Sequence, residues 1–222
     1  MRTYIYVDAY NLYYRQLKST PYKWLDLKKL CTILLKPQNT IVKIKYFTAR
    51  INGDWDISKP LRQDIYLQAI KAYIPEIEII EGEYKCRNIF MPTVESKGKK
   101  FVKIIKSEEK GSDVNLAVNL LHDGWSGCYD CAVVISNDSD LKESLKIVKN
   151  ELKRVIGLFI TDSKNAVKSL IDNSHFQKHI RENVLESSLL PSPIPNTNLY
   201  CPDKWKPNKY EKIGGVWEKK KI

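Results

Sequence analysis

Apolar positions along this 222-residue chain fall into short runs that alternate with stretches of helical spacing. Short apolar or alternating runs predict strands, whereas apolar residues three and four positions apart predict helices. The main predicted strands cover residues 4–8, 41–48, 77–83, 132–136 and 154–160, and a short one covers 101–105. The predicted helices cover residues 11–17, 25–36, 58–73, 111–122, 141–152 and 165–172, with Asp26 as the N-cap of the second.

Strands that alternate with helices predict a parallel, doubly wound sheet with right-handed crossovers. The least regular stretch runs from residue 84 to 109. Prolines follow Leu190, and a basic, aromatic segment follows the prolines. We therefore expect one domain over residues 1–190 and a proline-rich, then basic and aromatic tail over residues 191–222.

The overall charge favours a polyanionic partner, because the net charge is +11 and the isoelectric point is near 9.3. No apolar run approaches the ~18 residues of a membrane span. The N-terminus leads straight into a strand without the apolar region of a signal peptide, so we expect a cytoplasmic protein. Five cysteines argue against a disulfide framework, and the single Cys128-x-x-Cys131 pair lacks the partners of a zinc site.

Four aspartates stand where predicted strands end or helices begin: Asp8, Asp113, Asp138 and Asp140. The carboxyl ends of parallel strands meet in one crevice, so these acids are expected to converge. Two carboxylates ~4 Å apart repel by several kcal/mol at an effective dielectric constant of ~20. Hard divalent cations such as Mg²⁺ or Mn²⁺ relieve that repulsion. Four acids in one crevice of a basic chain predict a metal nuclease.

Each acidic segment alone has a simpler interpretation, because Asp and Asn commonly cap helices. Asp8 and Asn11 open one predicted helix, and Ser112 can cap another, which leaves Asp113 free to point elsewhere. The Gly-x-Gly-x-x-Gly fingerprint of dinucleotide sites and the Walker A loop are both missing from the sequence. The crevice is therefore acidic where a nucleotide-cofactor fold would be glycine-rich.

Three segments together resemble the NYN family, a branch of the PIN-like metal-dependent ribonucleases. Val7–Leu12 resembles its Asp-x-x-Asn motif, Glu109–Val114 its Glu-Lys-Gly-x-Asp motif, and Val134–Leu141 its Ser-x-Asp-x-Asp motif. The motifs stand in the family's order, and the resemblance covers residues 4 to about 160. Asn137 departs from the pattern, since many relatives have glycine there.

The resemblance implies a PIN-like three-layer α/β fold, with a central, mostly parallel sheet of strand order 3-2-1-4-5 flanked by helices. It implies an endoribonuclease that hydrolyses phosphodiester bonds of RNA with Mg²⁺ or Mn²⁺. The implied catalytic residues are Asp8, Asn11, Asp113, Asp138 and Asp140, of which the four aspartates would hold the metal. The substrate-binding candidates are Ser136, Arg50, Arg62, Lys110, Lys97, Lys99 and Lys100.

Other interpretations of the same residues stay open. A flap-type DNA nuclease would share the acids, and a non-catalytic RNA-binding regulatory protein would share the basic charge. A phosphatase with an aspartate nucleophile would need an acid where Tyr10 stands. In the tail, Trp205, Tyr210 and Trp217 alternate with lysines and would suit stacking on single-stranded bases, or the tail is a disordered end. RNA is the expected partner, no membrane is expected, and a homo-oligomer is possible.

Overall fold

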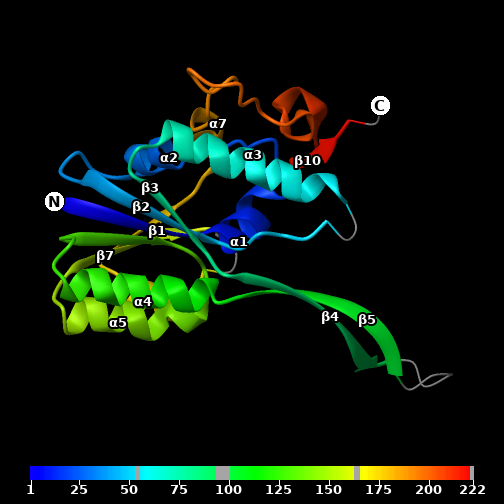
Figure 1. The fold of residues 1–222 in the computed structure, drawn as a ribbon. Coiled ribbons are helices and arrows are strands. Elements are labelled where there is room, and N and C mark those ends of the chain that lie inside the picture. The colour runs from blue at the N-terminus through cyan, green and yellow to red at the C-terminus, as the bar shows by residue number, and fades with distance from the viewer. Residues whose placement is uncertain (54–55, 94–100, 163–165, 221–222) are drawn as a thin grey trace.

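The computed structural model describes residues 1–53, 56–93, 101–162 and 166–220. A central sheet is covered by helices on both faces (Figure 1). Helices α2 (Leu27–Leu34), α3 (Ser58–Tyr73) and α7 (Glu182–Ser187) lie on one face. Helices α4 (Ser112–Trp125) and α5 (Lys142–Asn150) lie on the other. This arrangement confirms an α/β fold whose parallel sheet is flanked by helices.

The main sheet has six parallel strands in the order β3-β2-β1-β6-β7-β8. The expected order 3-2-1-4-5 is wrong as stated. Two strands of a separate hairpin precede β6 in the chain, and β8 extends the edge beyond β7. Strand β1 lies between β2 and β6, so the direction of winding reverses there. The strands are β1 (Arg2–Asp8), β2 (Thr40–Thr48), β3 (Ile77–Glu81), β6 (Cys131–Ile135), β7 (Val155–Ile160) and β8 (Phe176–His179).

The stretch that looked irregular in the sequence is an antiparallel hairpin of β4 (Glu83–Pro92) and β5 (Phe101–Lys110). It extends away from the body of the domain (Figure 1). Because solvent reaches both of its faces, its sequence carries no one-sided apolar alternation, and the predicted short strand at 101–105 continues to Lys110. The lysine candidates Lys97, Lys99 and Lys100 lie outside the described residues.

The core forms two layers, one on each face of the sheet. Ile5 and Val7 pack with α2 and α3, whereas Tyr6 and Val134 pack with α4 and α5. All four side chains are fully buried. Burial on both faces explains why the central strands read as continuous apolar runs rather than as alternating ones. Such strands hold their carboxyl ends rigidly, and the site stands at those ends.

Local capping fixes where the helices begin. The Asp26 carboxylate accepts a 2.9 Å hydrogen bond from the Lys29 N–H, so its predicted role as N-cap is confirmed. The prediction that Ser112 caps α4 is wrong. Gly111 precedes that helix with φ of 89°, and the Glu109 carboxylate accepts a 2.8 Å hydrogen bond from the Ser112 N–H. A glycine suits this left-handed backbone, because it has no Cβ to clash.

Two short helical segments follow β1: α1 (Ala9–Leu12) and then one π-helical turn (Tyr13–Leu17). Helix α6 (Lys168–Asp172) precedes β8. None of the described helices combines the length and the apolarity that a membrane crossing requires. The order of these elements places the first turn after β1 beside the ends of β6 and β7.

The C-terminal segment after Leu190 lies against the domain and ends in a small hairpin of β9 (Tyr210–Ile213) and β10 (Val216–Lys219). Tyr210 is only 5% exposed. Trp205 and Trp217 pack against the core layer that contains α2 and α3. The Trp217 indole N–H also donates a 2.7 Å hydrogen bond to the Glu182 carboxylate. The aromatic residues of the tail therefore contribute to packing.

Candidate active site

Asp8 ends β1 and caps α1 at the same time. Its Oδ1 accepts a 2.9 Å hydrogen bond from the Asn11 N–H, and its Oδ2 accepts a 2.8 Å hydrogen bond from the Ser136 hydroxyl. The side chain is buried, with 5% exposure of the residue. Each carboxylate oxygen has a second lone pair, so capping leaves acceptor sites on this group. Asp8 is thus held in one orientation at the switch point of the sheet.

Asn11 lies three residues after Asp8 and takes part in a short chain of hydrogen bonds. Its Oδ1 accepts hydrogen bonds from the Asn137 N–H at 3.1 Å and from the Thr161 hydroxyl at 2.5 Å. The side chain of Asn137 accepts in turn from the Val167 N–H at 3.3 Å. These bonds tie α1 to the segments that follow β6 and β7. Asn137, where many NYN relatives have glycine, is therefore a buried member of the network.

Asp138 and Asp140 follow β6 and start the short helical segment before α5. Oδ1 of Asp138 accepts a 3.0 Å hydrogen bond from the Asp140 N–H, so Asp138 caps this segment. Its own N–H donates to the Ser136 hydroxyl at 3.1 Å. Ser136 thereby contacts both Asp8 and Asp138, while Asp140 is exposed to solvent. The end of β6 and the end of β1 share one polar cluster.

Asp113 lies in the first turn of α4, and its pKa is affected by the charges of all the other acids of this cluster. Burial raises its pKa to about 6, and the charges of Asp8, Asp138, Glu109 and Asp140 add to the rise. Burial also raises the pKa of Asp8, against the opposing hydrogen bonds from Asn11 and Ser136, with smaller contributions from Asp138 and Glu109. The structure therefore brings the four predicted aspartates into electrostatic contact, although they come from three distant parts of the chain.

Two residues of this cluster escaped the sequence analysis. Glu109 belongs to the middle motif but was not among the predicted site residues. Its charge contributes to the raised pKa of both Asp8 and Asp113. Thr161 is fully buried directly after β7 and binds Asn11. Its position directly after an apolar strand would have predicted that Thr161 belongs to the site. A polar residue that follows a buried strand points to the same edge as Asp8 and Asp138 do.

The donor atoms in the cluster fit a hard divalent cation, since they are carboxylate, amide and hydroxyl oxygens. The mutual repulsion that raises the pKa of Asp113 is the repulsion that such a cation relieves. However, the described residues contain no three His, Cys, Asp or Glu side chains placed to share one ion. This fits a cation such as Mg²⁺, which is commonly held by one or two carboxylates, waters and substrate phosphates.

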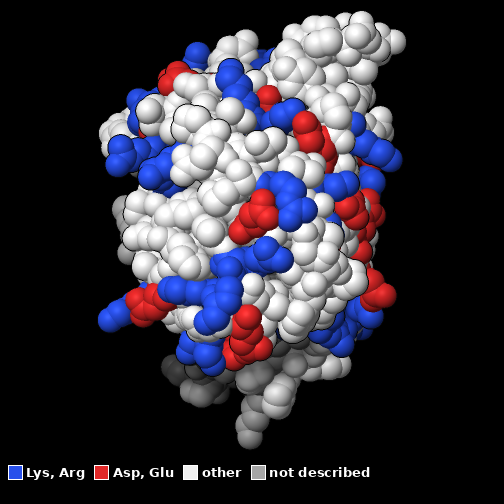
Figure 2. All heavy atoms as spheres, turned by 90° about the vertical axis from the view of Figure 1, so that its left-hand side faces the viewer, with Lys and Arg blue, Asp and Glu red and all other residues white. Residues whose placement is uncertain are grey.

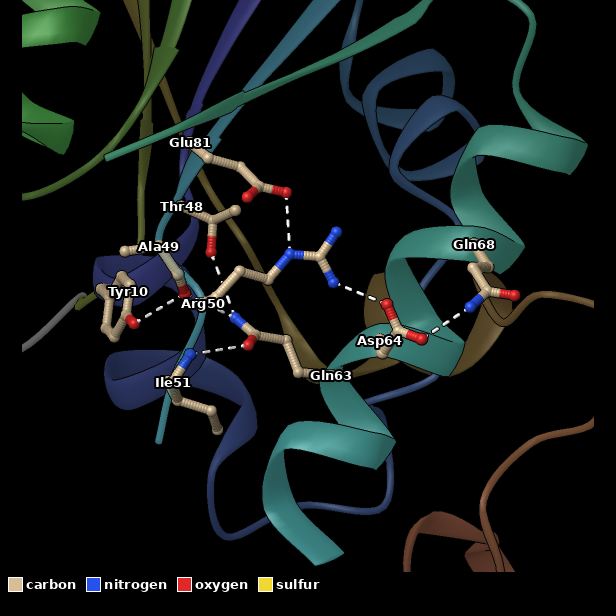
Figure 3. A network of polar contacts seen from close by, with 9 residues as sticks. All are labelled: Tyr10, Thr48, Ala49, Arg50, Ile51, Gln63, Asp64, Gln68 and Glu81. Carbon is tan, nitrogen blue, oxygen red and sulfur yellow. Dashed lines mark hydrogen bonds and ion pairs between the residues drawn. The ribbon is translucent and has the colours of Figure 1, made fainter. Parts of the chain in front are cut away.

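Arg50 follows β2 and is engaged in ion pairs within the chain. Its Nε contacts Glu81 Oε1 at 2.8 Å, and its Nη1 contacts Asp64 Oδ1 at 2.6 Å (Figure 3). Beside it, the Gln63 amide donates a 2.8 Å hydrogen bond to the Ala49 carbonyl. The guanidinium therefore joins the end of β3 to α3. A phosphate would have to compete with two carboxylates for this group.

Arg62 and Lys110 differ in burial and in their ion pairs within the chain. Nη2 of Arg62 pairs with Asp56 at 2.9 Å, and its guanidinium also binds the Ser58 hydroxyl, so the side chain is largely buried. Lys110 stands at the base of the hairpin, half-exposed, with its Nζ 4.0 Å from Glu108. It is adjacent in sequence to Glu109 and thus to the acid cluster. Of the basic candidates among the described residues, Lys110 is the one that stands nearest the acids along the chain.

The opposite edge of the sheet offers no surface of a single charge. Figure 2 shows this side, where Lys and Arg side chains spread among Asp and Glu side chains. Arg2 pairs with Asp130 at 2.8 Å there, and Lys28 pairs with Glu76 at 2.6 Å. The positive net charge is therefore partly neutralised on this side, away from the acid cluster.

The parallel sheet carries converging carboxylates at its switch point, and the family comparison places this arrangement in a nuclease-like α/β class. The NYN domain family matches residues 2–180. The chain therefore belongs to the NYN domain family, and the resemblance drawn from its motifs is confirmed. A NYN domain implies nucleic-acid binding, and nucleases of this kind typically use divalent metals.

Two further proteins are similar to this chain. One is the 6-hydroxy-3-succinoylpyridine 3-monooxygenase HspA of Pseudomonas putida S16, which is 32% identical and aligns with 92% of this chain and 75% of its own length. The other is a solved structure of a protein of unknown function from Vibrio parahaemolyticus. It has a TM-score of 0.54 and 15% identity, over 85% of this chain and 96% of that one. The latter likeness shows the fold alone.

Proposed function

We propose that this chain is a metal-dependent endoribonuclease. Membership of the NYN family supports the proposal, and one observation carries it. Asp113 has a pKa raised to about 6, by burial first and then by four acids that come from β1, the hairpin and the segment after β6. Three of the five carboxylates cap helical segments, but capping does not require them to lie together, and Asp113 and Asp140 cap nothing in the described contacts. Clusters of this kind with perturbed pKa values mark functional sites.

In this proposal Asp8, Asp113, Asp138 and Asp140 hold Mg²⁺ or Mn²⁺. No more than two of these carboxylates would bind one ion in the described arrangement, and waters and substrate phosphates would supply the other ligands. When bound, such an ion polarises the phosphodiester and lowers the pKa of a water that attacks it. Asp8 is the fixed member of the set, because the Asn11 N–H and the Ser136 hydroxyl orient its carboxylate. Asp140 is exposed and can reach toward solvent or substrate.

Asn11 and Ser136 act as positioning residues. Asn11 Oδ1 is saturated by the Asn137 N–H and the Thr161 hydroxyl, so its amide nitrogen is the end that remains for a ligand or water. Ser136 holds the Asp8 carboxylate and the Asp138 backbone in one frame. Lys110 is the proposed phosphate contact nearest the acids. Arg50 and Arg62 could bind a phosphate only if it competes with the carboxylates that their guanidinium groups already contact.

Incubation of labelled RNA and labelled DNA with the protein, with and without Mn²⁺, tests the proposal, followed by end-group analysis. We expect metal-dependent internal cleavage of RNA, which Asp8→Asn and Asp138→Asn abolish. Both variants should keep the fold and melt in chelator at the same or a higher temperature, because acid repulsion falls. Asp130→Asn is the matched control, since Asp130 precedes β6 and its acid lies at the opposite edge. Full activity of Asp8→Asn would refute the site.

The same assay separates the alternatives. Cleavage of branched DNA but not of RNA would identify a flap-type DNA nuclease. Tight RNA binding without cleavage under any metal would identify a non-catalytic RNA-binding protein. Cleavage that persists in chelator would show that the reaction does not require a metal ion.

A second candidate function comes from the Pseudomonas putida relative, whose name assigns it oxygenation of 6-hydroxy-3-succinoylpyridine. The observation that favours it is 32% identity over 92% of this chain. A monooxygenase consumes O₂ and two electrons from a reductant, which is chemistry that a cofactor usually carries. Oxygen uptake with this pyridine and a reduced nicotinamide or flavin is the test. Uptake above the rate without the pyridine would favour this function over the nuclease.

A further inference from the structure

A cavity of about 220 Å³ lies beside the acid cluster, on the other side of α1. The π-helical turn after α1, the first half of α3 and Trp205 of the tail enclose it. Ala9 and Tyr10 line it, while their neighbours Asp8 and Asn11 belong to the acid cluster. One short helix therefore connects the two sites. Of the residues that line the cavity, Arg62 is also a candidate phosphate contact of the proposed nuclease.

Aromatic rings form much of its wall. The rings of Tyr10 and Tyr14 are stacked, with centroids 6.2 Å apart and planes at 19°. Tyr13 meets Tyr14 edge-on at 5.3 Å, and on the far side Trp205 meets Tyr66 edge-on at 6.2 Å. Tyr14 is 58% exposed, although it belongs to this cluster. The Lys18 ammonium lies over the Tyr14 ring, so a planar ligand that stacks on Tyr14 would take the place of this cation.

Four basic side chains also line the cavity, and no acidic one does among the described residues. Lys23 is buried, with 5% exposure, and its Nζ lies 3.1 Å from the Tyr210 hydroxyl. Lys18 stands 5.0 Å from the centre of the Tyr14 ring. Arg62 and Lys59 complete the set, and Arg62 is partly neutralised by Asp56. The Lys23 ammonium donates hydrogen bonds to the Thr20 carbonyl and the Tyr210 hydroxyl, so it is satisfied within the chain. The exposed side chains of Lys18 and Lys59 are left to meet an anion.

The rim opposite Tyr14 is held rigidly. The Gln63 side chain bonds both the Ala49 carbonyl at 2.8 Å and the Ile51 N–H at 3.0 Å, and the Tyr10 hydroxyl bonds the same carbonyl at 3.0 Å (Figure 3). These contacts fix the segment after β2 against α1 and α3. A rigid, preformed wall lowers the cost of ordering a ligand.

We propose that this cavity binds a planar heteroaromatic ring that carries an anionic group. The ring stacks on Tyr14, and the anion meets Lys18, Lys59 and Arg62. The volume is below the ~300–1,000 Å³ of pockets for drug-sized ligands, so a single ring with its acidic group fits and a dinucleotide does not. Two sources supply this chemistry: one nucleotide of an RNA strand, or a free aromatic acid. The first source rests on the proposed nuclease function and would hold a base next to the acids.

Calorimetric titration in chelator tests the proposal without any catalysis, so a failed nuclease assay does not affect it. The probes are cytidine monophosphate, pyridine-3-carboxylate, its uncharged analogue pyridine-3-carboxamide, and cyclohexanecarboxylate as the non-aromatic acid. We expect at least one of the two aromatic anions to bind with a Kd of ~1 mM or below. Binding of the nucleotide alone indicates the RNA source, and binding of the pyridine acid alone indicates the free acid.

Two variants locate the binding. Tyr14→Leu should weaken the aromatic anion at least ~5-fold, as expected for lost stacking. Tyr200→Leu is the matched control, because Tyr200 is 57% exposed and lies outside the cavity lining. The double variant Lys18→Gln, Lys59→Gln should weaken the anion but leave the carboxamide unchanged. Equal binding of the cyclohexane acid, unchanged binding by Tyr14→Leu, or no binding of either aromatic anion would overturn the proposal.

Discussion

The hydroxyl of Ser136 donates a 2.8 Å hydrogen bond to Oδ2 of Asp8, and so joins the ends of two neighbouring strands that are 128 residues apart in sequence. The same oxygen accepts from the Asp138 N–H at 3.1 Å. One serine thus holds two of the proposed metal-binding segments. The bond to Asp8 is buried and the bond from the Asp138 N–H is partly buried, and a buried polar group left unpaired is costly.

Ser136→Ala should therefore affect stability and activity together. It leaves the Asp8 Oδ2 and the Asp138 N–H without this partner, so the free energy of unfolding should fall by ~1–3 kcal/mol. Loss of a bond that lowers the pKa of Asp8 should raise that pKa further. Urea denaturation measures the first effect, and the pH profile of RNA cleavage measures the second. Unchanged values for both would show that Ser136 does not position Asp8.

Asp113 should make the metal-free protein less stable as the pH rises. Its folded pKa of about 6 lies above its ordinary 3.8, so the folded state holds this proton more tightly than the unfolded state does. That stabilisation is present below pH ~3.8 and is lost as the pH rises through ~6. Asp113→Asn should thus raise the melting temperature in chelator more at pH 7.5 than at pH 4.5.

Asp130→Asn provides a control of opposite sign for this pH experiment. The hydrogen bond from Arg2 lowers the folded pKa of Asp130 to about 2. Its contribution to stability is therefore present above pH ~3.8, and removal should lower the melting temperature at pH 7.5. If Asp113→Asn lowers the melting temperature at pH 7.5, as Asp130→Asn is expected to do, the assigned environment of Asp113 is wrong.

Metal binding should be weak in the absence of RNA. No three acidic, His or Cys side chains among the described residues are placed around one ion, so substrate phosphates are expected to complete the coordination. Titration of Mn²⁺ should give a dissociation constant of ~1 mM for the protein alone and a much lower apparent value with uncleavable RNA. Tightly held zinc at Cys128 and Cys131 in the purified protein would contradict this prediction.

Phosphate contact by Lys97, Lys99 and Lys100 remains a prediction from the sequence, because these residues lie outside the described ranges. If they contact phosphates, changing all three to Gln should weaken RNA binding about equally for every RNA sequence. The log–log salt dependence should flatten by ~0.7 per lost contact to single strands. Filter binding across a salt series provides the measurement.

A matched triple variant controls for net charge in that experiment. Lys29, Lys36 and Lys153 are exposed on other surfaces, and their change to Gln removes the same charge. This variant should keep the salt slope of the unmodified protein. An unchanged slope for the loop variant as well would leave the loop as solvated surface.

Deletion of residues 203–222 should destabilise the domain. It removes buried Tyr210 and the packing of Trp205 and Trp217 against the core. Exposure of this apolar surface should lower the free energy of unfolding by ~3 kcal/mol or more. Urea denaturation of the shortened chain is the measurement, and Tyr200→Leu, which changes an exposed ring, is the control. An unchanged midpoint would show that the tail does not pack on the domain in solution.

The sequence by itself determined the central strands, the four aspartates of the candidate site and the helices apart from α7 (Glu182–Ser187), which was not predicted. The apolar runs at residues 4–7 and 132–135 had to be buried on both faces, and a parallel sheet is the structure that buries them so. Asp8, Asp113 and Asp138 were recognisable because polar residues at the ends of such strands or the starts of helices share one edge. Asp26 was recognisable as a cap because capping depends only on local backbone geometry.

Tertiary structure alone decided the rest. The β4–β5 hairpin has no buried face to impose a pattern, and β8 is too short at four residues to give one. Glu109 and Thr161 join the site only through packing of distant segments. The cavity depends even more on packing, because Tyr14, Arg62 and Trp205 come together from three separate parts of the chain. Local sequence patterns reflect burial and backbone geometry, whereas contacts between distant segments depend on how the whole chain packs.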